Sequence, residues 1–220
     1  MKFRLATVAD TAHIARLIHL TWGTPAYEDL IAEVLVRPEM PVWIVTGDNG
    51  LAGFCSGFMT RAADGTPRWE VDLLAVACEA RGQGLGRKLI AQSMQFGRQR
   101  GVALCRALIA VDNAASARCF EVNGFNAETA CDLWVGPPAT IEVSAPCPDG
   151  AHLIAVETLT YRGVWVEGRY DVPALMAAQQ LALADGRNTV GAVIPAGTAH
   201  DATQLPFAHI DAYRWWVLSM

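Results

Sequence analysis

The chain has 220 residues, of which 52% are hydrophobic and 18% are charged, and this composition excludes an intrinsically disordered protein. The net charge of −5, from 17 basic and 22 acidic residues, argues against a dedicated nucleic-acid-binding protein, which needs a basic face. No apolar run reaches the roughly 18 residues of a membrane-spanning helix, and the first residues lack the apolar core of a signal peptide. We therefore expect a cytoplasmic protein with neither a nucleic-acid nor a membrane partner.

The cysteines and histidines point to no covalent or metal framework. None of the six cysteines forms a CxxC pair, and most lie in apolar runs, so buried free thiols in a reducing compartment are favoured over disulfides. None of the five histidines has the spacing of a helix-borne metal site. We predict no metal.

The first 136 residues alternate strands and helices in a mixed α/β order. Apolar periodicity, helix caps and turns predict strands at 2–6, 42–46, 51–60, 68–77, 104–111, 125–128 and 131–135. The same signals predict a helix capped by Thr7 or Asp10, a helix over about 26–36, one that follows residues 81–86 and runs to about Arg100, and one from Asn113 to Gly124.

A stretch rich in proline and glycine over 137–150 predicts a linker between two regions. We accordingly divide the chain into a domain at 1–136, a linker at 137–150 and a smaller α/β segment at 151–220. That segment is predicted to contain strands at 152–157, 160–167 and 189–194, a helix at 173–184, and one or two strands within 207–218. Residues 89–96 and 175–182 are faintly alike, which fits either a degenerate half-repeat or two unrelated helices.

The strongest chemical signal is the sequence RGQGLG at 81–86, between a predicted strand and a predicted helix. Glycines at this junction expose consecutive backbone N–H groups at the positive end of a helix dipole, which suits a pyrophosphate. A plain turn is the simpler alternative. A dinucleotide-binding fingerprint is disfavoured, because the spacing is GxGxG and no acidic residue follows a second strand in the expected place.

Two segments resemble a known family. The run LLAVACEARGQGLGRKLI looks like motif A of the GNAT superfamily of acetyl-CoA-dependent N-acyltransferases, in which Arg81, Gly84 and Gly86 match the conserved positions of the motif. The run NAASARCFEVNGF resembles motif B of that superfamily, from Asn113 to Phe125. The resemblance covers about residues 1–136 and implies a GNAT-like α/β domain with a mixed sheet.

The resemblance also implies where acetyl-CoA binds. The main chain around Leu74, Ala75 and Val76 would pair with the pantetheine arm as an added strand. The loop would hold the pyrophosphate through the residues Arg81, Gly82, Gln83, Gly84, Leu85, Gly86 and Arg87. Asn113 would bind near the pantetheine or simply cap its helix, and Phe120 would lie beside it.

Direct attack of an amine on the thioester requires a base. Glu70 is the first candidate, because one branch of the family has a catalytic glutamate at this place, and Asp72 lies on the same strand face. Two carboxylates there would attract a cationic amine and raise each other's pKa. The simpler alternative is the solvated face of a strand. Phe120 replaces the tyrosine that many relatives use as general acid, so the thiolate would leave without that donor.

These observations favour an N-acetyltransferase that acts on a primary amine of a small molecule or protein. The alternative is a catalytically weak sensor or interaction module that binds CoA, which Phe120 favours. The sequence leaves open the acceptor, the acyl length and the oligomeric state, including a homodimer through exposed strands of the tail. We expect residues 151–220 to pack on the acceptor side of the first region.

Overall fold

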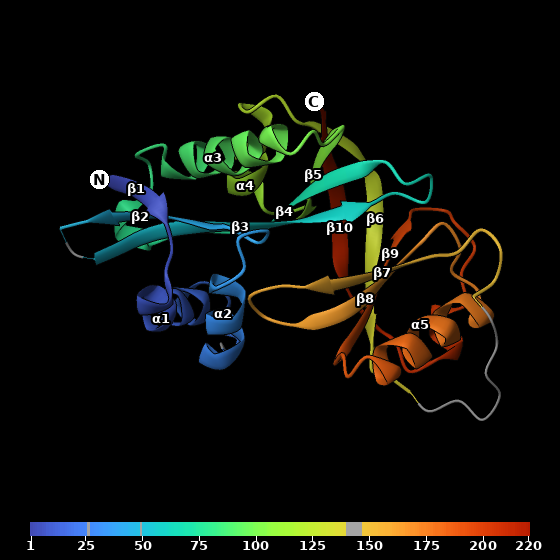
Figure 1. The fold of residues 1–220 in the computed structure, drawn as a ribbon. Helices are drawn as coiled ribbons and strands as arrows, with labels where there is room; N and C mark the ends of the chain where they lie inside the picture. Colours follow the sequence, from blue (N-terminus) through green and yellow to red (C-terminus); the bar gives the residue numbers. More distant parts are fainter. Residues whose placement is uncertain (26, 49, 140–146) are drawn as a thin grey trace.

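The computed structural model describes residues 1–25, 27–48, 50–139 and 147–220, and the strands in these ranges form one ten-stranded mixed sheet (Figure 1). The strands are β1 Lys2–Leu5, β2 Val42–Gly47, β3 Gly50–Arg61, β4 Pro67–Val76, β5 Leu104–Ala110, β6 Asn126–Gly136, β7 His152–Glu157, β8 Arg162–Glu167, β9 Thr189–Pro195 and β10 Ala208–Ser219. The α-helices are α1 Thr11–Trp22, α2 Glu28–Leu35, α3 Leu85–Gln99, α4 Ala114–Glu121 and α5 Val172–Ala184.

The strand order across the sheet is β1-β2-β3-β4-β5-β10-β6-β9-β8-β7. Helices α3 and α4 cover one face of the first half, and α1 and α2 lie on the opposite side (Figure 1). Helix α5 packs on β8 and β9 in the second half. The mixed α/β architecture that the sequence predicts is therefore confirmed.

The last strand, β10, lies inside the sheet. It is antiparallel to β5, with Tyr213 opposite Ala110, and antiparallel to β6, with Ala208 opposite Val135. Residues that follow the predicted linker thus supply a central strand to the first region. The division of the chain at 137–150 remains a prediction, and residues 140–146 of that linker lie outside the described residues.

Two predicted strands near the end of the first region are one strand. This strand, β6, pairs with β10 from Asn126 to Val135, and the register shifts where Arg214 and Trp216 oppose Ala130 and Ala127. The extra residue on β6 is a β-bulge. Exposed polar residues at this bulge look like a turn in the sequence, which is why two strands were expected. Likewise, 207–218 contains one long strand.

The core of the first half is built around Trp69. Its indole Nε1 donates a hydrogen bond to Ser93 Oγ of α3 at 2.9 Å, and its side chain is fully buried. A Cβ atom at Gly57 would lie 2.6 Å from the indole, and one at Gly97 would lie 3.0 Å from it. Glycine is therefore required on both sides, and Trp69 fixes α3 against β3 and β4.

The β7–β8 hairpin packs onto the first half rather than away from it. Ile154 and Leu159 share the core of the first half, and the rings of Trp165 and Phe58 are 5.5 Å apart. Arg162 forms an ion pair with Glu33 of α2. The tail therefore packs against the first region, as expected, and the expectation that this is the acceptor side stays a prediction.

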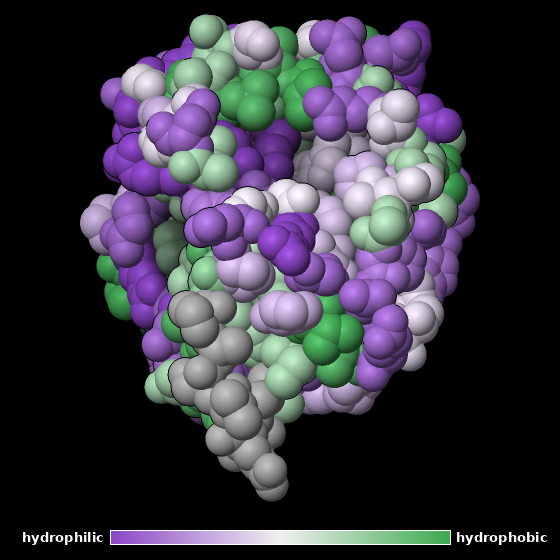
Figure 2. Space-filling model, turned by 90° about the vertical axis from the view of Figure 1, so that its right-hand side faces the viewer, coloured by the Kyte–Doolittle hydropathy of each residue, from purple (hydrophilic) through white to green (hydrophobic). Residues whose placement is uncertain are grey.

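The surface seen from the side of the C-terminal segment is a mosaic of hydrophilic and hydrophobic residues, with the hydrophobic ones in separate small groups (Figure 2). Within the described ranges, no helix has the length and apolar character needed to cross a bilayer. A homodimer through this segment stays a prediction.

All six cysteines are described and are free thiols: Cys55, Cys105 and Cys131 are buried, Cys119 is half-buried, and Cys78 and Cys147 are exposed. The expectation of buried thiols therefore fails for the last two. Both lie in irregular segments outside the sheet and the α-helices.

Candidate active site

A gap opens between the parallel strands β4 and β5. They pair only from Arg68 opposite Leu104 to Glu70 opposite Arg106. Beyond that point β4 continues beside β3 to Val76, and β5 continues beside β10 to Ala110. The two strands therefore diverge after Glu70, and their facing edges are left to other partners.

The edge of β4 in this gap is formed by alternate residues. Ala77 N–H donates to Ala52 O in β3, so the main-chain groups of Val76 and Leu74 point the other way, toward the gap. The Val76 carbonyl accepts a hydrogen bond from Arg81 Nε at 3.2 Å. Ala75 pairs with Phe54 in β3 and is buried, so of the three residues predicted to contact pantetheine it alone faces away from the gap.

The glycine-rich loop follows β4 after one turn of 3-10 helix, Cys78–Ala80. Gly82 and Gly84 have φ values of 78° and 69°, which L side chains rarely adopt, and an added Cβ would meet open space at either position. Gly84 is the N-cap of α3 and supplies no side chain to its first N–H groups. The first turn of a helix has unpaired N–H groups and a positive dipole end, so this loop can bind an anion through the main chain.

The rest of the loop divides into exposed and packed residues. Arg81, Gln83 and Arg87 are exposed, whereas Leu85 is buried in the core and offers only its amide. A Cβ at Gly86 would lie 3.2 Å from Cys119 Sγ of α4 and 3.7 Å from the Leu74 side chain. The missing side chain at Gly86 therefore serves helix packing, whereas Gly82 and Gly84 leave room above the loop.

The motif B residues also have local roles. The Asn113 side chain accepts a hydrogen bond from Ser116 N–H at 3.1 Å and caps α4, which is the simpler of its two predicted roles. Phe120 is buried, and its ring packs edge-on against Phe125 at 5.0 Å. Phe120 is thus a core residue, and cofactor contact by either residue remains a prediction.

Glu70 lies in a buried ion cluster. Arg106 Nε donates to its two carboxylate oxygens at 2.8 and 2.9 Å, and the Thr60 hydroxyl also donates to it. Arg106 and Arg68 reach on to Glu167 of β8, at 2.5 and 2.9 Å. Burial raises the pKa of Glu70, although the positive charge of Arg106 acts to lower it. Burial also opposes ionisation of Glu167, but the two guanidinium groups keep its pKa below the ordinary value. This balanced cluster joins the tail to the sheet.

Asp72 is in a different environment. It lies two residues beyond the last β4–β5 pair and is half-buried. Ser56 Oγ donates to it at a long 3.4 Å. Burial, with the charge of Glu70, raises the pKa of Asp72 to about 7. The negative charge of Asp72 in turn adds to the effect of burial in raising the pKa of Tyr161. A carboxyl group that titrates near neutrality suits proton transfer.

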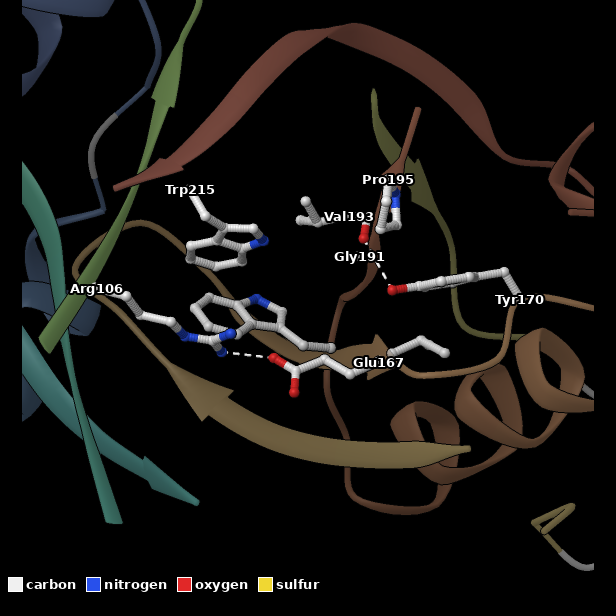
Figure 3. Close-up of a pocket in the computed structure, with 9 residues that line it drawn as sticks. Arg106, Glu167, Tyr170, Gly191, Val193, Pro195 and Trp215 are labelled. Carbon is white, nitrogen blue, oxygen red and sulfur yellow. Dashed lines mark hydrogen bonds and ion pairs between the residues drawn. The ribbon is translucent and has the colours of Figure 1, made fainter. Parts of the chain in front are cut away.

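A cavity of about 160 Å³ lies between Arg106 and the second half of the sheet (Figure 3). Its walls include the rings of Trp165, Tyr170 and Trp215. The Arg106 guanidinium lies over the Trp215 ring, 4.1 Å from its centre. Because Arg106 also faces Glu70 at the last β4–β5 pair, the cavity adjoins the point where the gap begins.

This part of the site is not among the residues predicted from the sequence. Arg106 is a charged residue inside an otherwise apolar strand, and Glu167 ends an alternating strand, which were the available signals. Neither residue shows its partner, because the contact joins residues 61 positions apart. Among the described residues, no cluster of three or more metal-ligating side chains is present.

The chain was compared with known proteins. Residues 9–125 match the model of the acetyltransferase (GNAT) family, which is more than half of the chain. No significant match was found among curated proteins. A ribosomal-protein-alanine N-acetyltransferase from Brucella melitensis is similar at 25% identity, with a TM-score of 0.54 over 60% of this chain and 88% of that one.

Two further solved structures show the fold. A GCN5-related N-acetyltransferase from Sphaerobacter thermophilus has a TM-score of 0.62 at 12% identity and covers 99% of this chain and 95% of its own. The NatC complex bound to Gag peptide and CoA has a TM-score of 0.51 at 18% identity, over 59% of this chain and 86% of that one.

The diverging strands and the glycine-rich loop belong to an N-acetyltransferase, an enzyme whose fold binds acetyl-CoA or CoA. The chain is a member of the GNAT acetyltransferase family. The resemblance seen in the sequence is thereby confirmed, and with it the general activity of acetyl transfer.

Proposed function

We propose that this enzyme transfers an acetyl group from acetyl-CoA to the amino nitrogen of an acceptor that enters from the face formed by the tail. The observation that carries the proposal is the gap between β4 and β5, which begins at Glu70 and lies between the glycine-rich loop and the cavity. A cofactor arm laid along β4 would end near the acceptor side.

The chain offers matching groups for acetyl-CoA. The main-chain groups of Leu74 and Val76 point into the gap and suit an amide-bearing arm. The open space above Gly84, together with the uncapped first turn of α3, suits a pyrophosphate. Arg81 and Arg87 are exposed at the rim and would add positive charge. When bound, acetyl-CoA supplies the activated thioester carbonyl.

Asp72 is the better candidate for the base. Glu70 is held by Arg106, Thr60 and Arg68, and protonating its carboxylate would leave two buried guanidinium groups to share the single charge of Glu167. Asp72 has one long hydrogen bond, a half-buried carboxyl group and a pKa of about 7. Asp72, the second base candidate suggested by the sequence, is therefore the base in this proposal.

The reaction balances with this assignment. The amine nitrogen forms a bond to the acetyl carbon, the carbon–sulfur bond breaks, and the sulfur leaves with the electron pair of that bond. The nitrogen gives its proton to the Asp72 carboxylate, directly or through water. A thiol has a pKa of about 8.5, so a thiolate can leave without the hydroxyl that Phe120 lacks.

The direct test is a turnover assay with acetyl-CoA and a panel of amines, with release of free thiol as the readout. We expect amine-dependent thiol release that falls at least tenfold in Asp72→Asn while the Kd of CoA is unchanged. If no amine stimulates release although CoA binds, the acetyl-transfer proposal fails for this chain.

A second candidate function, a CoA-responsive module with little turnover, is favoured by the buried Phe120 ring, which occupies the place of a proton donor. The same assay separates the two functions. Phe120→Tyr adds a hydroxyl at this position, and a large gain in turnover would favour the sensor, whereas an active parent enzyme favours catalysis.

A further inference from the structure

The cavity beside Arg106 is built mainly by the C-terminal segment. Trp165 comes from β8, Gly191 and Val193 come from β9, and Tyr170 lies between β8 and α5. Trp215 of β10 completes the ring of aromatic side chains (Figure 3). Residues outside the matched family segment thus supply most of the wall that an acceptor would meet.

Two of the three aromatic wall residues, Tyr170 and Trp165, have their polar atoms in hydrogen bonds within the chain. Tyr170 Oη donates to the Val193 carbonyl at 2.9 Å (Figure 3), and Trp165 Nε1 donates to Tyr161 Oη at 2.9 Å. The rings of Trp165 and Trp215 meet edge-on at 6.4 Å. Tyr170 and Trp165 therefore present ring surface to the cavity, and the Trp215 ring lies edge-on to that of Trp165.

The charged groups of the wall are also paired. Arg106 binds Glu70 and Glu167, and Glu167 binds Arg68 as well. Two positive and two negative side chains balance each other within this cluster. An acceptor whose body, the part that occupies the cavity, carries a charge would have to break one of these ion pairs. An acceptor with an uncharged body would not.

The size of the cavity sets the size of that body. Its volume is about 160 Å³, and an apolar protein cavity of about 150 Å³ binds benzene. A peptide chain needs a long groove, whereas this compact cavity is bounded on one side by Trp165 and Glu167 of the β7–β8 hairpin. The hairpin is tied to the region of α2 by the pairs Arg162–Glu33 and Arg37–Glu157.

We propose that the acceptor is a small amine whose uncharged body is one aromatic ring or an apolar group of that size, held among Trp165, Tyr170 and Trp215. This inference rests on the proposed acetyl transfer, since the amine nitrogen must reach from the cavity to the gap beside Asp72. Trp165 links the two places through its hydrogen bond to Tyr161, whose pKa responds to the charge of Asp72.

Two substitutions change the cavity in opposite directions. In Gly191→Ala the added Cβ lies 3.5 Å from Trp165 Cδ1, an ordinary contact, so the strand tolerates it while the cavity shrinks. In Val193→Ala the half-buried side chain is shortened and the cavity grows. Val36→Ala, at an exposed position, is the matched control for a valine substitution.

The experiment measures acetylation of benzylamine, propylamine, 1-naphthylmethylamine and a pentapeptide with a free N-terminus, using the full chain and each variant. Binding of benzylamine is followed separately by tryptophan fluorescence in the presence of CoA. We expect benzylamine to exceed propylamine and the peptide in kcat/KM by at least tenfold. Gly191→Ala should raise the KM and Kd of benzylamine about tenfold, and Val193→Ala should favour the naphthyl amine. Val36→Ala should change nothing.

The outcomes separate this inference from the proposed function. Preference for propylamine or the peptide, unaffected by Gly191→Ala, overturns the inference and leaves acetyl transfer intact. Benzylamine binding that is weakened by Gly191→Ala, without acetylation of any amine, supports the cavity assignment and overturns the proposed function. Absence of benzylamine binding overturns the inference whatever the turnover of other amines.

Discussion

The chain contains two strand–helix–strand units of the same order, β4–α3–β5 and β8–α5–β9, and they differ where each helix begins. The N-cap position of helix α3 is Gly84, which has no side chain to cap the helix. The N-cap of helix α5 is Asp171, whose carboxylate accepts a hydrogen bond from Ala174 N–H at 3.2 Å. Asp201 accepts a second hydrogen bond, from Val172 N–H, at 3.2 Å. One helix N-terminus is left for an external anion, and the other is neutralised by its own chain.

The two units also differ in how far their two strands pair with each other. Strands β8 and β9 pair from Gly163 to Val166, nearly the whole length of β8. Strands β4 and β5 pair over only three residues at one end of β4. Of these two units, only the first combines a released strand edge with a helix that lacks a side-chain cap, the two features that the proposed acetyl-CoA site uses.

The largest effect is expected from removing the tail after Gly136. This truncation deletes β10, which pairs with both β5 and β6, and leaves Arg68 and Arg106 without Glu167. We expect an insoluble or unfolded product without CoA binding, measured by circular dichroism and calorimetry. A soluble truncated chain that binds CoA would show that the first unit is independent of the second.

The next largest effect is expected at Asp72. Asp72→Asn should lower kcat by about 10²–10⁴-fold with little change in CoA affinity. In the parent enzyme kcat/KM should rise with pH through about 7, because Asp72 must lose its proton. The pH profile should be taken with a weakly basic amine that stays neutral above pH 6. A parent-like profile in Asp72→Asn would return the role to Glu70 or to water.

The same substitution has a consequence for stability. The pKa of Asp72 is raised in the folded chain to about 7 from an ordinary value of 3.8. The folded state therefore holds its proton more tightly, and stability falls as the pH rises from about 4 to 7. At pH 8 we expect Asp72→Asn to be more stable than the parent by about 1 kcal/mol, measured by urea unfolding. Equal stability at pH 8 would contradict the raised pKa.

A smaller effect is expected when the first helix is given the kind of cap found in the second. Gly84→Asp introduces a carboxylate at the N-cap of α3, and Gly84→Asn introduces a neutral side chain of the same shape at the same φ of 69°. We expect the Kd of CoA to be about tenfold or more higher in the aspartate variant than in the asparagine variant. Equal affinities would argue against an anion site at this loop.

The smallest effect is expected from the reverse change. Asp171→Ala removes the cap of α5 and its ion pair with Arg169. We expect a loss of about 0.5–2 kcal/mol in the free energy of unfolding and no change in CoA affinity. Altered CoA affinity in this variant would mean that the two units are coupled more closely than their separate helices suggest.

Much of the fold is predictable from the sequence because its signals are local. Asn113 as a cap, the glycines at 82 and 84, and most strand positions follow from neighbours a few residues away. The resemblance between 89–96 and 175–182 falls on α3 and α5, the equivalent helices of the two units.

The site is less predictable because its decisive contacts join distant residues. Nothing local to Glu70 indicates that Arg106 binds it or that Glu167 of the tail joins the same cluster, nor that Asp72 is left half-buried beyond the last strand pair. Gly86 reads as a phosphate-loop glycine, but its position opposite Cys119 depends on how α4 packs. The role of each of these residues is determined by tertiary packing.

The place of β10 within the sheet has a consequence for synthesis. Strand β6 ends at Gly136 and β10 begins at Ala208, about 70 residues later. At a translation rate of roughly 5–20 residues per second, β5 and β6 wait roughly 4–14 s for the strand that separates them. During that interval their edges are unpaired and open to other strands. We expect the nascent chain to be most vulnerable to aggregation then, and the first half of the sheet to close only after the second half has emerged.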